Sequence, residues 1–147
     1  MMITFKDCLK NKRIVKFPKG RGLVRREMRA AVDDLTDAKF GFVHKRYKWS
    51  TIQGYYSMFH AARALLFSAG YRESSHRCLI VAVDALFVET GKLGRECIDY
   101  FYGAMGLREN ADYRVEFSEE SARLIVRRAD EFLSRVQEIL KSSRNTD

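Results

Sequence analysis

Apolar side chains recur every three or four positions along most of this 147-residue chain. Between residues 23 and 47 they stand at positions 24, 28, 31, 35, 38 and 42, which places them on one face of an α-helix. Pro18 is the only proline, so long stretches contain no strong helix breaker. This pattern predicts an almost wholly helical protein, because its period is that of a helix and not that of a strand.

The same period continues through four more segments that are bounded by helix-capping residues. Ser75 and Ser118 are suited to begin helices, and Gly106 is suited to end one. Short connections between long helices favour antiparallel neighbours. We therefore predict an all-α fold, an up-and-down antiparallel bundle of four to five helices with a basic N-terminal arm. The expected helices cover about residues 23–47, 50–69, 75–88, 93–105 and 119–141.

The predicted bundle spans residues 22–141, between a basic arm of residues 1–21 and a frayed tail of residues 142–147. The first 30 residues hold ten Lys or Arg and two acidic residues, whereas the remainder is neutral, with seventeen of each sign. This excess suggests a surface that faces a polyanion, although a solvated segment without a partner explains it equally well. Only residues 13–17 resemble a strand, and they are too short to found a sheet.

Several classes of protein are excluded by what the sequence lacks. The most apolar segment, residues 78–88, is too short to span a bilayer, and the N-terminus has no apolar signal core. We therefore expect a cytoplasmic protein without membrane association. The three cysteines are odd in number and widely spaced, which argues against both a disulfide and a zinc site. Because dinucleotide, P-loop, zinc-protease and serine-hydrolase motifs are also missing, we expect no cofactor and no metal.

Three groups of polar side chains remain as candidates for a binding site. One lies on the helix expected over residues 50–69, one begins the next helix, and one precedes the last helix. Guanidinium groups, helix N-termini and aromatic rings are the features that bind phosphates and stack on bases. The groups are Tyr55, Tyr56, His60 and Arg63; Ser75, His76 and Arg77; and Arg108, Asn110, Asp112 and Tyr113.

In this order the three groups resemble the HEPN family (higher eukaryotes and prokaryotes nucleotide-binding domain), in its small stand-alone prokaryotic branch. The matching stretches are YYSMFHAARALLFSAGY, SSHRCLIVAVDALFVETGKL and LRENADY, followed by SEESA, and the similarity runs from about residue 22 to 140. The resemblance implies a helical bundle that forms a homodimer and binds nucleotide or RNA. It also implies a partner, because many members are encoded beside a minimal nucleotidyltransferase as toxin–antitoxin pairs. The nucleotide- or phosphate-binding residues would be Arg108, Asn110, Tyr113, His76, Arg77, His60 and Arg63.

Other HEPN proteins are metal-independent ribonucleases that carry an arginine followed, four to six residues later, by a histidine. Here Arg108 matches the arginine, but no histidine follows it, because His76 is the last one in the chain. A ribonuclease with this degenerate motif is the catalytic alternative, with Arg108 and Asp112 as its candidate catalytic residues. Asp112 would act as a base only if burial or a neighbouring carboxylate raised its pKa. In a related branch the partner attaches nucleotide to a tyrosine, which makes Tyr113 a candidate site of modification.

Each of these residues also has a structural explanation. Arg63 could form a buried pair with Asp84, and Arg108 could form a salt bridge with Asp112 four residues later. His60 could be a satisfied core or interface histidine. A third hypothesis is a non-enzymatic dimerisation or adaptor module whose basic arm contacts an acidic partner or nucleic acid.

The binding-site interpretation makes one demand on the fold. Arg108, Tyr113 and His76 must converge once the bundle closes, although His76 lies about 30 positions before the other two in the sequence.

Overall fold

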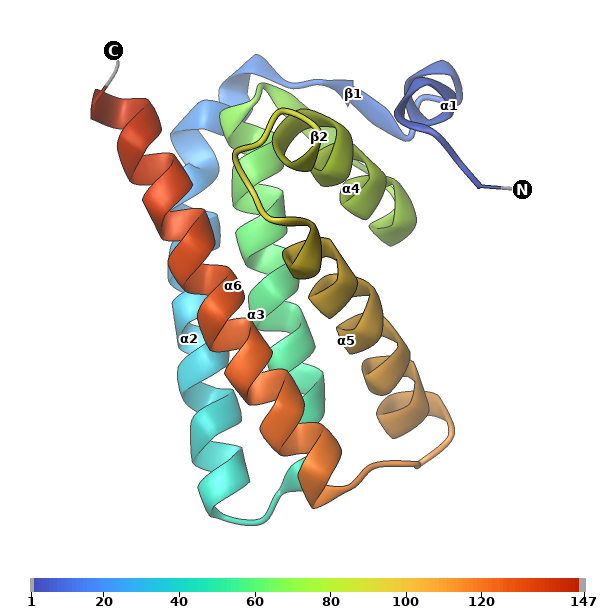
Figure 1. Ribbon diagram of the computed structural model, residues 1–147, viewed down its shortest axis with the longest axis vertical. Helices are drawn as coiled ribbons and strands as arrows, with labels where there is room; N and C mark the ends of the chain where they lie inside the picture. The colour runs from blue at the N-terminus through green and yellow to red at the C-terminus, as the bar shows by residue number, and fades with distance from the viewer. Residues whose placement is uncertain (1, 146–147) are drawn as a thin grey trace.

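In the computed structural model, which describes residues 2–145, long helices run along the length of the molecule around a central helix, α3 (Figure 1). Helices α2, α5 and α6 all pack against α3. A shorter helix, α4, also packs against α3, near the end of the molecule that carries the two short strands. A π-helical turn, η2, continues α4. The all-α fold predicted from the sequence is confirmed. The bounds are α2 Val24–Val43, α3 Tyr47–Ser68, α4 His76–Val83, η2 Asp84–Val88, α5 Arg95–Tyr113 and α6 Glu119–Asn145.

Helix α3 is central because nearly all of its surface is apolar or small. Its buried side chains include Met58, Leu65 and Leu66, none of which is exposed to solvent. At Gly54 the helix approaches α6 so closely that a Cβ atom would lie 3.2 Å from Cγ2 of Ile125. The missing side chain at Gly54 is therefore what allows the two helices to pack at this distance.

Two glycine substitutions should have opposite effects on stability. Gly54→Leu forces a side chain into the contact with Ile125 and should lower the free energy of unfolding by about 1–3 kcal/mol. Gly106→Ala should raise it by about 0.5–1 kcal/mol, because a Cβ there meets no atom within 4 Å and alanine favours the helix. Urea unfolding of both variants checks the prediction, and a loss of stability in Gly106→Ala would contradict it.

Two predicted helix boundaries are wrong. Gly106 does not end a helix, because α5 runs through it to Tyr113, and the burial of Phe101, Ala104 and Ala111 outweighs the low helix propensity of one glycine. Residues 107–113 are therefore the last turns of α5 and not a connecting loop. Likewise, α3 begins at Tyr47, before the serine and threonine expected to cap it.

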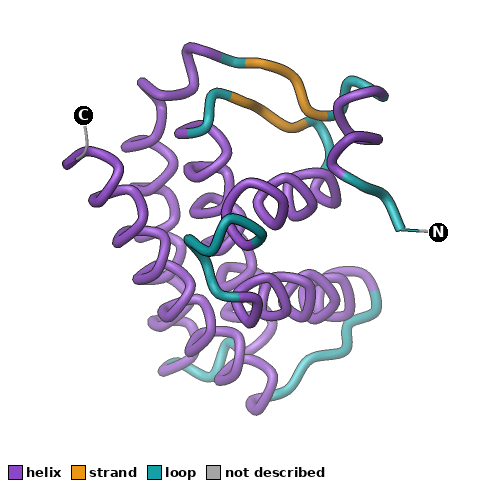
Figure 2. The backbone as a smooth tube through the Cα atoms, turned by 45° about the horizontal axis from the view of Figure 1, so that its top comes forward, coloured by secondary structure: helices purple, strands orange, loops and turns teal. Residues whose placement is uncertain are grey.

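The N-terminal arm is folded onto the bundle. It contains a short helix, α1 (Phe5–Lys10), a strand, β1 (Ile14–Lys16), and a 3-10 helix, η1 (Pro18–Leu23). Strand β1 pairs antiparallel with β2 (Tyr71–Glu73), and Figure 2 shows the two strands side by side near the N-terminus. Residues 14–16 thus do form a sheet, since β2 supplies the second short strand that the sequence pattern did not reveal.

A disulfide between Cys8 and Cys78 also ties the arm to α4, which the cysteine count argued against. The count was misleading because pairing depends on proximity in the fold: the two Cα atoms lie 5.8 Å apart although 70 positions separate them in sequence. The third cysteine, Cys97, is a buried free thiol.

The last helix extends further than predicted. Helix α6 continues past residue 141 to Asn145, so most of the expected frayed tail is helical, and residues 146–147 lie outside the described part. Among residues 2–145, no helix is both long and apolar enough to cross a membrane.

Candidate functional site

Helix α3 leaves one narrow stripe of its surface open. Between positions 49 and 67, the residues that are not buried follow one another at intervals of three or four, so they share a single face of the helix. This face carries Tyr56, His60 and Arg63, three members of the first polar group. The complete stripe is Trp49, Gln53, Tyr56, His60 and Arg63.

Arg108, in the last turns of α5, lies against this stripe. Its Nη2 donates a 3.0 Å hydrogen bond to the hydroxyl of Tyr56, and its guanidinium carbon lies 5.5 Å from the centres of the Tyr55 and Tyr56 rings. The side chain is only 14% exposed, and its buried Nε has no hydrogen-bond partner in residues 2–145. A buried charged donor without a hydrogen-bond partner is costly, so Arg108 has hydrogen-bonding capacity that the described residues leave unused.

His76 approaches the same place from α4. It follows Ser75, whose side chain accepts a hydrogen bond from the backbone of Cys78 and so caps the helix as predicted. Nδ1 of His76 lies 2.7 Å from the hydroxyl of Tyr55, which is completely buried. Burial raises the pKa of Tyr55, so the phenol keeps its proton and is able to donate it to this hydrogen bond.

The hydrogen bond between Tyr55 and His76 allows two arrangements of protons. If Tyr55 donates to Nδ1, the neutral ring carries its proton on Nε2 and presents a hydrogen-bond donor there. If Nδ1 donates to the Tyr55 oxygen, Nε2 has a free lone pair and can accept a proton. The first arrangement suits phosphate binding, and the second suits general base catalysis.

Tyr113 completes the cluster at the end of α5. Its ring centre lies 5.4 Å from the guanidinium carbon of Arg108, and 71% of the residue is exposed. Arg108 therefore contacts Tyr113 on one side and, on the other, Tyr55, whose hydroxyl meets His76. The structure brings together the three residues whose convergence the binding-site interpretation required. We call Tyr55, Tyr56, His76, Arg108 and Tyr113 the Arg108 cluster.

The pKa of His76 is lowered, mainly because burial disfavours the charged ring and secondly because Arg108 repels a second positive charge. His76 should therefore remain neutral in the folded protein below its ordinary pKa of about 6.5. The unfolded chain then binds the extra proton, so this residue should make the protein less stable as the pH falls below about 6.5, with no such effect above it.

Histidine-ring NMR titration checks this prediction. The Arg108→Met variant should raise the titration midpoint of His76, because it removes the positive charge while keeping much of the side-chain volume. An unchanged midpoint in Arg108→Met would show that Arg108 does not influence His76 electrostatically.

His60 and Arg63, expected to bind phosphate, are instead engaged with carboxylates. Nδ1 of His60 lies 2.6 Å from Glu27, and Arg63 donates two hydrogen bonds to one oxygen of Glu73, at 2.6 and 3.2 Å. The Glu73 side chain is only 3% exposed. Arg63 does not pair with Asp84, which binds Arg95 on the surface. This arrangement favours a structural ion-pair network for His60 and Arg63 over a phosphate contact.

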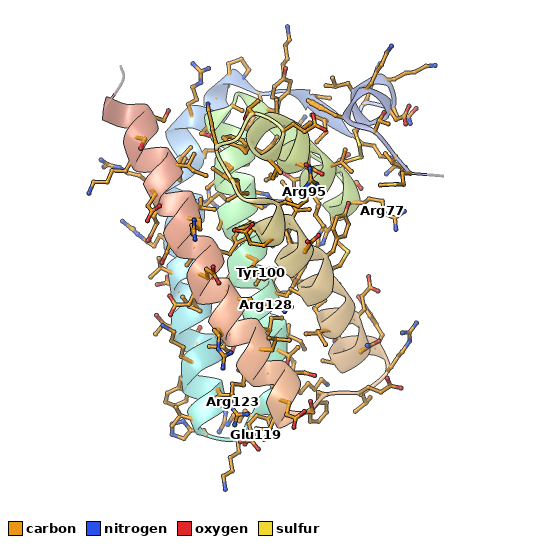
Figure 3. The ribbon with its side chains drawn as sticks, viewed as in Figure 1. Arg77, Arg95, Tyr100, Glu119, Arg123 and Arg128 are labelled. Carbon is orange, nitrogen blue, oxygen red and sulfur yellow. A yellow bond between two sulfur atoms is a disulfide. The ribbon has the colours of Figure 1, made fainter. Side chains whose placement is uncertain are left out.

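The remaining candidates lie at the edge of the cluster. Asp112 is 3.9 Å from Nε of Arg108, at the limit of an ion pair and too far for a hydrogen bond. Asn110 accepts a hydrogen bond from Arg114, one turn further along the chain. Arg77 is exposed and projects away from α4 (Figure 3). These three residues do not share the contacts that join Arg108 to His76.

Other members of the site were missed or misread in the sequence. Tyr56 belongs to the first polar group but was not among the residues expected to bind phosphate, and its hydroxyl accepts a hydrogen bond from Arg108. Phe59 links the cluster to the ion-pair network, since its ring lies 4.5 Å from that of His76 and 4.6 Å from the guanidinium of Arg63. The sequence near Glu27 and Glu73 did not indicate their roles, because each forms its ion pair with a residue of a different helix or strand.

Comparison with known proteins identifies the family to which this chain belongs. The model of the HEPN domain family matches residues 24–140, which include the whole Arg108 cluster. A UPF0332 protein of Thermotoga maritima is 30% identical over 115 residues, covering 77% of this chain and 87% of its own. A protein of Methanocaldococcus jannaschii named "Putative toxin MJ0605" is 30% identical over 128 residues, covering 80% and 92%. A UPF0332 protein of Archaeoglobus fulgidus is 30% identical over 119 residues, covering 80% and 94%. With a family match over most of its length, the chain belongs to the HEPN family.

Proposed function

We propose that this HEPN protein binds the phosphate of a nucleotide or an RNA strand at the Arg108 cluster. The observation that carries the proposal is the state of Arg108, which is largely buried, held by three tyrosine rings and left with an unpaired Nε–H. A guanidinium fixed in this way loses little further freedom when it binds, and it can offer two parallel hydrogen bonds to one phosphate.

The neighbouring groups suit the rest of such a ligand. His76 can donate from Nε2, and it occupies the first turn of α4, where backbone N–H groups lack partners within the helix and the helix dipole favours an anion. The ring of Tyr113 is exposed beside Arg108 and offers a face on which a base can stack.

Fluorescence anisotropy with a labelled ATP analogue and with a labelled single-stranded RNA, both in EDTA, tests the proposal. We expect saturable binding that inorganic phosphate weakens by competition. Binding should fall in Arg108→Ala and persist in Arg123→Ala, which removes an exposed arginine of α6 that pairs with Glu119 (Figure 3). Equal affinity in the two variants would contradict the assignment of the site.

One observation favours a second function, metal-independent RNA cleavage. The sequence lacks the histidine expected after Arg108, but the hydrogen bond between Nδ1 of His76 and the Tyr55 hydroxyl places this imidazole in the Arg108 cluster. In this scheme Nδ1 donates to the Tyr55 oxygen, and the lone pair of Nε2 takes the proton of a ribose 2′-hydroxyl. The 2′-oxygen bonds to phosphorus to form a 2′,3′-cyclic phosphate, and the bond to the 5′-oxygen breaks as that oxygen takes a proton from water. Arg108 stabilises the negative charge that develops on the phosphate.

Incubation of RNA with the purified protein in EDTA distinguishes cleavage from binding. If His76 is the base, His76→Ala should reduce cleavage by about 100-fold or more while leaving much of the RNA affinity intact. Cleavage that persists in His76→Ala would rule out this role, and RNA that is bound but never cut would leave the binding function alone.

We also propose that the protein is a toxin-like homodimer that works with a nucleotidyltransferase. The pairing that the HEPN resemblance implies and the toxin names of two relatives support this part of the proposal. Tyr113 is the candidate acceptor of a nucleotide, because its side chain is exposed at the end of α5.

Co-expression with a nucleotidyltransferase from a neighbouring reading frame tests the partnership. We expect a complex on gel filtration and a nucleotidyl mass increment on the peptide that contains Tyr113. The increment should be absent in Tyr113→Phe. A protein that elutes as a monomer and stays unmodified in the presence of such an enzyme would contradict this part.

A further inference from the structure

The Cys8–Cys78 disulfide joins two parts of the molecule that meet at the candidate site. Cys78 lies in the first turn of α4, two positions after His76, and Cys8 lies on α1 in the N-terminal arm. Figures 1 and 2 show α1 at the periphery, beside the start of the chain. The bond therefore connects a peripheral helix to the turn that carries a residue of the Arg108 cluster.

Several other contacts of the arm are made with residues of the same segment, just before Cys78 in the sequence. Strand β1 pairs with β2 at Val15 and Arg72, and the backbone of Ser74 donates a hydrogen bond to the carbonyl of Arg13. The ring of Phe5 packs edge-on against Tyr71. The arm thus holds residues 71–78, which include Glu73 of the ion-pair network and His76 of the Arg108 cluster.

We propose that Cys8–Cys78 is a thiol–disulfide exchange site whose reduction by a dithiol loosens residues 71–78 and weakens ligand binding at the Arg108 cluster. The second half of this statement rests on the proposed function. The first half does not, because it concerns only the bond and the segment it holds.

The local chemistry favours exchange at this bond. A thiolate of the reductant attacks the sulfur of Cys8, the bond between the two cysteine sulfurs breaks, and Cys78 leaves as a thiolate. The second thiol of the reductant then releases Cys8 and closes its own disulfide, so two electrons pass to the protein. Cys78 is the better leaving group because its position in the N-terminal turn of α4 stabilises a negative charge on its sulfur.

Both cysteines are almost completely buried, so attack requires the arm to open locally. Helix α1 is only six residues long, and both its own Leu9 and the preceding Ile3 are about 40% exposed. A short peripheral helix with such partial burial is the type of element that opens without global unfolding.

Reduction would affect ligand binding because it frees the arm from α4, which removes the covalent restraint next to His76. We therefore expect the oxidised protein to bind more tightly than the reduced one, by about fivefold or more, the lower end of typical coupling between sites.

The experiment compares the full chain in buffers of oxidised and reduced dithiothreitol, with thiols counted by mass spectrometry. The oxidised form should show one reactive thiol after unfolding, and the reduced form three. Amide exchange of peptides covering residues 71–78 should rise at least severalfold on reduction, whereas peptides from the centre of α3 should not change. The affinity for the labelled ATP analogue should fall at the same time.

Two variants serve as controls. In Cys8→Ser, amide exchange of residues 71–78 should be as fast in both buffers as in the reduced parent protein. Cys97→Ser alters only the free thiol, so it should respond to reduction like the parent protein. Identical exchange of residues 71–78 in the oxidised and reduced forms would overturn the proposal. If amide exchange changes on reduction but neither form binds ligand, the thiol–disulfide exchange site is supported. The proposed function is then contradicted.

Discussion

Replacing Arg108 with alanine should lower the affinity for an ATP analogue or an RNA oligonucleotide by about 10- to 100-fold. Hydrogen bonds to a charged group contribute about 1.5–3 kcal/mol each, and Arg108 supplies both the charge and the unpaired Nε–H. Because only 14% of the side chain is exposed, water screens this contact less than it would at the surface. Anisotropy titrations at a fixed salt concentration measure the effect.

The Arg108→Lys variant separates charge from geometry. Lysine keeps the positive charge beside the three tyrosine rings but cannot make the two-point contact of a guanidinium. Its affinity should lie between those of the parent and the alanine variant. Arg123→Ala, as the surface control, should stay within about twofold of the parent, given the small effect of an exposed pair. Full affinity in Arg108→Lys would mean that charge alone matters. Full affinity in Arg108→Ala would contradict the assignment of the binding site to the Arg108 cluster.

The helices were predictable because their signal is local. The apolar period located all of the long helices, and Ser75 and Ser118 were correctly identified as caps, since a capping side chain bonds to a backbone group three positions away. Gly106 was misjudged for the converse reason. Whether a glycine ends a helix depends on what the following turns bury, and Ala111 packs into the core from beyond it.

The site was predictable only in part because its contacts are long-range. The order of the three polar groups, together with the family resemblance, indicated that Arg108, His76 and Tyr113 belong together. The ion-pair partners of His60 and Arg63 could not be predicted from the sequence, because Glu27 and Glu73 lie on other elements, α2 and β2. The sequence pattern named Tyr55 and Tyr56 as polar candidates but could not show that their hydroxyls meet His76 and Arg108.

Loss of the disulfide, by a Cys8→Ala substitution, should lower the free energy of unfolding by about 4 kcal/mol. The bond closes a long loop, with 70 positions between its ends, so it restricts the unfolded chain strongly. Among the described residues, the attachments of α1 and β1 other than the disulfide include the three-residue pairing of β1 with β2, the hydrogen bond from Ser74 to Arg13 and the edge contact of Phe5 with Tyr71. Urea unfolding of the oxidised parent and of Cys8→Ala measures the difference.

The reduced parent protein is the matched control for this measurement. It keeps both cysteine side chains and lacks only the bond, so its stability should fall close to that of Cys8→Ala, apart from the small cost of deleting one sulfur atom. If reduction costs little while Cys8→Ala costs much, packing at Cys8 and not the covalent bond stabilises the arm. If neither change lowers stability by more than about 1 kcal/mol, the arm is held by the strand pairing, because a constraint across so long a loop should contribute more than that.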